Sequence, residues 1–85
     1  MKILFHQNFK KKFKKLRAIQ KKVDERLVLF SKDPFDPILN NHGLTGKYKG
    51  CRSINITGNY RAVYELVDDN TAYFIALDTH PNLYK

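Results

Sequence analysis

The stretch that decides the fold is CRSINITGNYRAVYELVDDNTAYFIAL, residues 51–77. Its first part, residues 51–57, places Arg52, Ile54 and Ile56 on one side and small or polar side chains on the other. An alternation with a period of two residues is typical of a strand that buries one face. The stretch therefore predicts a β-sheet against which the rest of the chain packs.

Two turn signals divide the remainder of this stretch. Thr57-Gly58-Asn59 predicts a hairpin turn after the first strand, and Asp68-Asp69-Asn70 predicts a second turn. Residues 60–67 are then the return strand, and residues 71–77, which are rich in aromatic and β-branched side chains, are the third strand. Together these segments predict a three-stranded antiparallel meander.

An amphipathic helical region precedes the meander. A single helix over its apolar face would be about 33 Å long at 1.5 Å per residue, which is long for so small a domain. We therefore expect a tight bend at residues 17–20, which gives a helical hairpin, with Asn8 as its N-cap. The apolar residues that recur at steps of three and four are Phe9, Phe13, Leu16, Ile19, Val23, Leu27 and Phe30.

Short segments complete the architecture. Residues 1–5 predict an N-terminal strand. Two Asp-Pro steps within residues 33–37 end the helical region, because the residue before a proline is pushed out of the helical conformation. Residues 38–50 predict a mostly irregular surface connection. The order of elements predicts one α+β domain over residues 1–85, with helices on one face of the sheet and the other face free.

Composition excludes several classes of protein. No apolar run approaches the roughly 18 residues of a membrane span, and no apolar leader precedes the first strand, so we expect a cytoplasmic protein without a membrane partner. The single cysteine, Cys51, cannot form an internal disulfide. With three scattered histidines it gives no zinc-ligand spacing, so we expect no metal and no cofactor.

Positive charge is concentrated at the start of the chain. The sequence holds 16 Lys and Arg against 8 Asp and Glu, a formal charge of +8, and the first acidic residue is Asp24. This distribution predicts either a nucleic acid or an acidic protein as partner. A lysine-rich helix face that only contacts water is the alternative.

Basic and titratable side chains also follow the predicted meander. RNA cleavage without a metal needs a base for the ribose 2′-OH, a cation for the phosphate and a proton donor for the leaving 5′ oxygen. Histidine suits proton transfer, because its unperturbed pKa of about 6.5 lies near working pH. Arg61 could equally be an exposed sheet residue, and Tyr84 a ring packed on the sheet edge. The candidates are His42, Lys47, Lys49, Arg52, Arg61, His80 and Tyr84.

Four motifs stand in and around the meander. They are Leu44-Thr45-Gly46, Gly50-Cys51-Arg52-Ser53, Tyr60-Arg61-Ala62-Val63-Tyr64 and Thr79-His80-Pro81-Asn82-Leu83-Tyr84. Together with the order of elements, this combination resembles the RelE/ParE superfamily of bacterial type II toxins, and most closely the YafQ-like mRNA interferases. The resemblance covers nearly the whole chain and implies a RelE-like fold.

The resemblance implies a small toxin that enters the ribosomal A site, beside 16S rRNA, cleaves mRNA there, and is inhibited by a cognate acidic antitoxin. It implies proton transfer by His42 and His80, substrate positioning or base stacking by Tyr84, and stabilisation of the transition-state phosphate by Arg61. The residues we expect to contact RNA are Lys10, Lys11, Lys14, Lys15, Lys47, Lys49, Arg52, Asn55 and Asn59.

Two positions depart from the pattern of the YafQ-like toxins. Asn55 and Asn59 stand where those toxins carry a histidine and an aspartate, and an amide side chain does not titrate at neutral pH.

Two other functions remain open at this level. The superfamily also holds ParE members that inhibit DNA gyrase and cleave no RNA, and a basic nucleic-acid-binding module without catalysis is a third possibility. The histidine and tyrosine of the terminal motif favour the ribonuclease.

Overall fold

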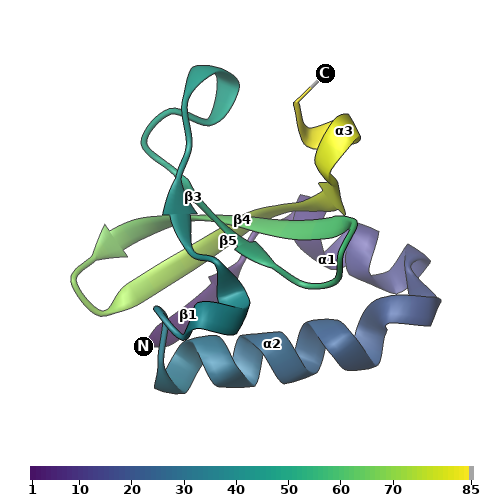
Figure 1. The fold of residues 1–85 in the computed structure, drawn as a ribbon, viewed down its shortest axis with the longest axis horizontal. Helices are drawn as coiled ribbons and strands as arrows, with labels where there is room; N and C mark the ends of the chain where they lie inside the picture. The colour runs from purple at the N-terminus through teal and green to yellow at the C-terminus, as the bar shows by residue number, and fades with distance from the viewer. Residues whose placement is uncertain (85) are drawn as a thin grey trace.

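The meander forms the centre of a five-stranded mixed sheet in the computed structural model, which describes residues 1–84 (Figure 1). Strands β3 (Arg52–Asn55), β4 (Tyr60–Asp68) and β5 (Thr71–Thr79) pair antiparallel, as the sequence predicts. The strand β1 (Lys2–Phe5) pairs in parallel with β5, and the short β2 (His42–Gly43) pairs antiparallel with β3. The sheet order is therefore β1-β5-β4-β3-β2, and the predicted α+β class is confirmed.

A β-bulge lies in the centre of the sheet. Val63 pairs with Ala76 whereas the next residue, Tyr64, pairs with Phe74, so β5 carries one extra residue, Ile75, at this point. The bulge places Phe74 and Leu77 on the same face although they are three residues apart, and both are buried. One face of β5 thus stays apolar along its length.

The helical region is a hairpin, as predicted. Helix α1 (Gln7–Lys15) and helix α2 (Gln20–Lys32) are separated by the 3-10 turn η1 (Arg17–Ile19). The predicted N-cap is wrong, because the imidazole Nδ1 of His6, and not the side chain of Asn8, accepts a hydrogen bond from the Asn8 backbone N–H, at 2.9 Å. No helix within residues 1–84 is long and apolar enough to span a membrane.

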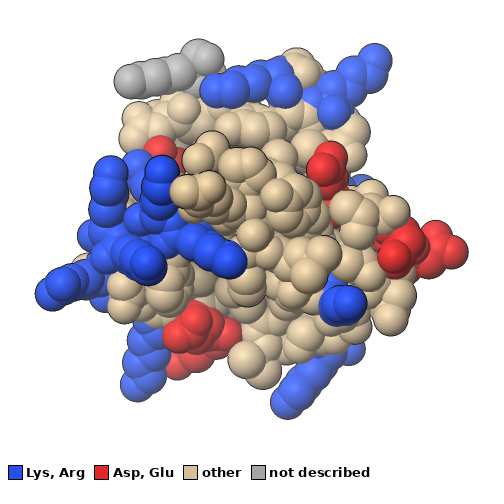
Figure 2. All heavy atoms as spheres, turned by 180° about the vertical axis from the view of Figure 1, so that it is seen from behind, with Lys and Arg blue, Asp and Glu red and all other residues tan. Residues whose placement is uncertain are grey.

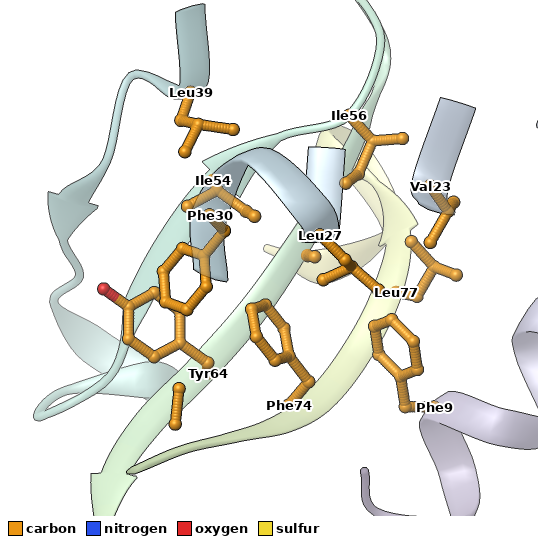
Figure 3. Close-up of a cluster of buried hydrophobic side chains, with 12 residues drawn as sticks. Phe9, Val23, Leu27, Phe30, Leu39, Ile54, Ile56, Tyr64, Phe74 and Leu77 are labelled. Carbon is orange, nitrogen blue, oxygen red and sulfur yellow. The ribbon is translucent and has the colours of Figure 1, made fainter. Parts of the chain in front are cut away.

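An aromatic cluster between the helical hairpin and the sheet forms the core (Figure 3). The ring of Phe30 stands edge-on to Tyr64 and Phe74, with centroids 4.9 and 5.2 Å apart, and Phe9 stands edge-on to Phe74 at 5.8 Å. Edge-to-face pairs at this spacing are favourable beyond the area that they bury. This cluster fills the space between the helical hairpin and one face of the sheet.

The expectation of a free second face is wrong. Ser53, Val63 and Leu83 lie outside the core cluster, and each is 3% exposed or less. Figure 1 shows what stands on this face, on the side of the sheet opposite α2: the segment between β2 and β3 and the short helix α3 (His80–Leu83). The segment also holds the 3-10 turn η3 (Gly46–Tyr48), and the 3-10 turn η2 (Pro37–Leu39) precedes β2, so residues 38–50 are less irregular than predicted.

Candidate functional site

The short helix α3 positions two of the predicted site residues. Thr79 begins the helix, because its Oγ1 accepts a hydrogen bond from the Asn82 N–H at 3.4 Å, and Pro81 fits the first turn, where no N–H is needed. The rings of His80 and Tyr84 lie one turn apart, with centroids at 4.8 Å. The backbone N–H of His80 donates to the Asn59 carbonyl at 3.0 Å, which ties the helix to the turn between β3 and β4.

Arg61 lies at that same turn. Its Nη1 donates to the carbonyl oxygens of Thr57, Gly58 and Tyr60 at 3.0 to 3.1 Å. All hydrogen bonds of the guanidinium to residues 1–84 involve this one nitrogen, so Nε and Nη2 are available to an anion. The structure therefore brings Arg61, His80 and Tyr84 to one end of the sheet.

Sequence reasoning missed Tyr48, which lies in the turn η3. Its ring stands edge-on to Tyr84 with centroids 6.4 Å apart, and the Lys47 Nζ lies 5.4 Å from the centre of the Tyr48 ring. A tyrosine between two lysines, Lys47 and Lys49, in a loop is the signal that could have identified it, because aromatic rings beside cations are typical of surfaces that stack nucleic-acid bases.

Asp78 holds the site together and was also not predicted. Its carboxylate accepts hydrogen bonds from the Thr79 N–H at 2.8 Å and the Asn82 amide at 3.1 Å, and it pairs with Lys12 of α1 at 3.2 Å. Partial burial raises the pKa of Asp78, but the bonds from Thr79, Asn82 and Lys12 outweigh it, so the net pKa lies below the ordinary value. The carboxylate thus links β5, α3 and α1 as an anion.

An open pocket of about 290 Å³ lies beside α3. It does not include His80 or Arg61, which lie next to it. Its lining combines cations, an anion and amides, and so suits a polar ligand with negative groups. The polar residues that line it are Asn8, Lys12, Lys47, Tyr48, Asp78 and Asn82.

His42 lies apart from this end of the sheet. Across the sheet, His42 pairs with Ser53, Ser53 pairs with Val63, and Val63 pairs with Ala76 of β5. Three strand spacings, roughly 14 Å, therefore separate His42 from β5. The ring Nδ1 lies 2.7 Å from the Asn40 carbonyl oxygen. Because a carbonyl only accepts, Nδ1 carries the proton, and the Nε2 of a neutral ring can accept one. The structure does not bring the two predicted proton-transfer histidines into contact.

Arg52 is engaged in packing, away from Arg61. Its Nε donates to the Asn41 Oδ1 at 2.8 Å, and its guanidinium lies 5.4 Å from the centre of the Phe35 ring. The Asn41 amide in turn donates to the Tyr64 hydroxyl at 2.8 Å. Arg52 and Ile54 are two residues apart on β3, so their side chains lie on the same face of the sheet. Arg52 therefore lies at the edge of the face that carries the core.

Two polar atoms on the site face are buried without a partner within residues 1–84, namely Ser53 Oγ and Asn55 Oδ1. Asn55 pairs with Arg61 across β3 and β4, so its amide lies in the same row as the guanidinium. Buried polar atoms are rarely left unpaired in native proteins. Because the Asn55 oxygen is buried, a ligand group could reach it only if neighbouring side chains moved. The side chain of Asn59 is exposed at the neighbouring turn.

The predicted lysines of α1 divide between its two sides. At about 100° per residue, Lys10 and Lys14 lie roughly 160° around α1 from Lys12, which faces Asp78, whereas Lys11 lies roughly 100° and Lys15 roughly 60° from it. Lys12 lines the polar pocket, Lys10 and Lys14 line a second pocket on the other side of α1, and Lys11 and Lys15 line neither of these two pockets.

The chemistry of the remaining candidates is limited. Burial raises the pKa of the Cys51 thiol, and the negative charge of Glu65 raises it further, so Cys51 is not an activated nucleophile. Across residues 1–84, no three His, Cys, Asp or Glu side chains lie where they could hold a metal ion.

Comparisons with known proteins agree with this architecture. The model of the YafQ toxin family, described as a bacterial toxin of type II toxin-antitoxin systems, matches residues 1–85. A crystal structure of YafQ from E. coli superposes with a TM-score of 0.83 at 20% identity, covering 98% of this chain and 97% of that one. No curated protein matches significantly.

Two further structures extend the comparison. A copper-bound mutant toxin from Helicobacter pylori is 30% identical, with a TM-score of 0.78 and 98% of each chain covered. The E. coli DinJ-YafQ toxin-antitoxin complex matches at 22% identity with a TM-score of 0.80, over 98% of this chain and 96% of that one. The fold is thus that of solved toxins, one of them in complex with its antitoxin.

Proposed function

The chain belongs to the YafQ family of bacterial toxins of type II toxin-antitoxin systems, and from this premise we propose that it is an endoribonuclease that cleaves mRNA on the ribosome. The observation that carries the proposal is the grouping of Arg61, His80 and Tyr84 at one end of the sheet. This grouping combines a fixed cation, an imidazole that can donate or accept a proton and an aromatic ring for a base.

The proposed reaction is attack by the ribose 2′-OH on the adjacent phosphorus. The O2′–P bond forms and the P–O5′ bond breaks, which leaves a 2′,3′-cyclic phosphate and a 5′-OH. Arg61 neutralises the charge that builds on the non-bridging oxygens, and its three carbonyl partners fix the guanidinium before the substrate arrives. His80 donates a proton to the leaving 5′ oxygen.

His42 is the candidate base, because its Nε2 can take the proton of the 2′-OH. The O2′ and O5′ atoms are bonded to the same phosphorus in the transition state, so His42 and His80 can act in one reaction only if bound RNA draws β2 and α3 together.

Stacking and phosphate contacts would hold the RNA in place. Tyr84 and Tyr48 stand edge-on to each other, so a base that stacks on one ring contacts the edge of the other. Lys47, which lines the polar pocket, and the exposed Lys49, Lys11 and Lys15 would contact phosphate groups. Asn59 would contact the backbone beside His80.

The proposed partners follow from the same family. The YafQ of the DinJ-YafQ complex is bound to its antitoxin. For this chain, with a charge of +8, we infer a cognate acidic antitoxin and, as substrate, mRNA in the ribosomal A site of the cytoplasm.

Primer extension on a reporter mRNA after induction tests the proposal. His80→Ala and Arg61→Ala should each reduce cleavage by about 100-fold or more, because each removes a group that acts in the transition state. The exposed Lys32 is far along the chain from these motifs, so Lys32→Ala serves as the control and should cleave like the wild type.

Three results would contradict the proposal. Wild-type cleavage in both site variants would exclude their role. Growth arrest with intact mRNA and inhibited DNA gyrase would assign the chain to the ParE-like toxins. Binding of RNA without any cleavage would leave a non-catalytic nucleic-acid-binding module.

A further inference from the structure

Arg52 contacts both chain neighbours of His42 from the opposite face of the sheet. Gly43, the residue after His42, pairs with Arg52 across β2 and β3. Because side chains alternate along a strand, the His42 ring and the Arg52 side chain lie on opposite faces. The Arg52 guanidinium donates to the Asn41 side chain at 2.8 Å and to the Asn41 carbonyl oxygen at 3.3 Å. Its Nη1 lies 3.6 Å from the position that a Cβ would take on Gly43, so it rests against the strand on the other side of His42.

Asn41 connects this contact to the core. Its amide nitrogen donates to the Tyr64 hydroxyl and to the Pro34 carbonyl oxygen, both at 2.8 Å. Tyr64 is 2% exposed, so its hydroxyl is a fixed partner. Strand β2 has only two residues and therefore few ladder hydrogen bonds of its own. The place of β2 on the sheet thus depends on the side-chain bonds of Asn41.

The residue before Asn41 directs the His42 ring. Asn40 has a φ of 45° and a ψ of 48°, a left-handed conformation that asparagine adopts more readily than most residues. In this conformation its carbonyl oxygen lies 2.7 Å from the His42 Nδ1, so the proton is on Nδ1 and the Nε2 lone pair faces outward. A histidine side chain without such a contact mostly carries its proton on Nε2. The protein therefore holds the less common tautomer.

Arg52 differs from the cations that are placed for phosphate contact. Figure 2, which views the molecule from the far side of Figure 1, shows many Lys and Arg side chains that project away from the surface. Arg52 is half-buried, and two of its three guanidinium nitrogens donate to Asn41. Its planar fork is used on the chain's own backbone and amide, a geometry that a lysine cannot reproduce.

We propose that Arg52 and Asn41 are positioning residues for His42. They hold residues 40–43 in place, so that the Asn40 carbonyl keeps the proton on Nδ1 and leaves Nε2 to accept one. This role replaces the RNA contact that the sequence predicts for Arg52. The consequence for cleavage rests on the proposed function, in which His42 takes the proton of the 2′-OH, whereas the positioning rests only on these contacts.

The tautomer of His42 provides the decisive measurement, because it reports positioning without any substrate. A long-range hydrogen–nitrogen NMR spectrum of the full chain at about pH 9, where imidazole rings are neutral, identifies the protonated ring nitrogen. The wild type should show Nδ1–H. Arg52→Ala and Asn41→Ala should each shift the ratio of the two tautomers about 5-fold or more toward Nε2–H, as expected for the loss of one hydrogen bond. Arg52→Lys keeps the charge without the fork and should shift the ratio in the same direction, which provides a second variant if Arg52→Ala does not fold.

A matched pair at Asn40 tests the role of its backbone. Both Asn40→Gly and Asn40→Val remove the exposed side-chain amide. Glycine adopts positive φ freely, whereas a β-branched residue does so rarely. Asn40→Gly should therefore keep Nδ1–H, and Asn40→Val should lose it.

Cleavage and RNA binding should respond differently to Arg52→Ala. The single-turnover rate of cleavage should fall about 10- to 100-fold, because a misplaced base reacts more slowly. RNA affinity and its salt dependence should equal those of the wild type, since no phosphate contact is lost. Lys49→Ala removes an exposed cation of the neighbouring segment and is the control: it should weaken RNA binding and leave the His42 tautomer unchanged.

Each outcome decides the proposal. A wild-type ring protonated on Nε2, an unchanged tautomer in the Arg52 and Asn41 variants, or equal effects of the two Asn40 variants would overturn it. A salt slope reduced by about 0.7 in Arg52→Ala, with the wild-type tautomer, would make Arg52 a phosphate contact instead. If the variants change the tautomer and the wild type cleaves no mRNA, the positioning of His42 stands and the proposed ribonuclease function fails.

Discussion

The two sides of α1 border pockets of similar size and opposite chemistry. On one side, Lys12 pairs with Asp78 in a pocket of polar and charged groups of about 290 Å³. On the other, Lys10 and Lys14 rim a groove of about 230 Å³ with a phenylalanine floor. These lysines belong to one run of the sequence, and their surroundings differ because consecutive helical residues are rotated by about 100°. One run of lysines therefore contributes to two different surfaces, and these surfaces suit two kinds of partner.

The same division separates stability from function. The apolar side of α1 continues into the aromatic core through Phe9, whereas the polar side ends at the face that leaves the oxygens of Ser53 and Asn55 unpaired. Changes on the apolar side should cause the largest losses in the free energy of unfolding, and changes on the polar side should mainly alter RNA binding and cleavage. Four predictions test this division.

The largest effect is expected from Phe9→Ala. Phe9 is 2% exposed and contacts both Phe5 and Phe74, so its removal should lower the free energy of unfolding by about 3 to 5 kcal/mol, as measured in urea. Asn8→Ala, one residue away on the polar side, is the control and should change it by less than about 0.5 kcal/mol. Equal losses in the two variants would mean that the two sides do not differ in stability.

Tyr48→Ala should weaken binding of a short single-stranded RNA by about 1 to 3 kcal/mol, the range for one stacked base. Tyr48→Phe keeps the ring and should bind like the wild type. Fluorescence anisotropy on a labelled RNA measures both. A structural role alone would lower the melting temperature of Tyr48→Ala and leave the affinity of its folded fraction unchanged.

Asp78→Asn should cost about 1 kcal/mol of stability at pH 7, because the carboxylate bonds to Lys12, Thr79 and Asn82 weaken. The pKa of Asp78 is lowered in the folded state, so its contribution is complete above the unfolded pKa of about 3.9 and is lost as pH falls through the folded pKa. The difference between wild type and variant should therefore shrink below about pH 4 in thermal unfolding. A difference that stays constant down to pH 2 would contradict the ionic role.

The smallest effect is expected in the salt dependence of RNA binding. Lys11→Ala/Lys15→Ala should reduce the slope of log affinity against log salt by about 1.4, which corresponds to two phosphate contacts on a single strand. Lys10→Ala/Lys14→Ala, on the groove side, should leave the slope unchanged. The opposite result would place the RNA on the groove side of α1.

Much of the fold follows from local sequence patterns. The alternation in residues 51–77 and the turns at Gly58 and Asp69 predict β3, β4 and β5 to within a few residues, and the spacing of apolar residues predicts the helical region, whose length relative to the small domain indicates the bend before α2. These signals depend on residues a few positions apart, so the chain carries them without any tertiary contact. The four-residue α3 was missed, because so short a helix has no apolar period of its own.

The sequence by itself determined the α+β class, the family resemblance and the presence of Arg61, His80 and Tyr84 in recognisable motifs. Only the tertiary structure decided which of them meet: Arg61 and His80 share one turn, Tyr48 joins Tyr84, and His42 and Arg52 lie elsewhere on the sheet. The pairing of β1 with β5 and the side of α1 that each lysine occupies were decided there as well. The physical reason is that strand pairing and helix packing join residues far apart in the chain, and a local pattern specifies which face is buried but not which partner buries it.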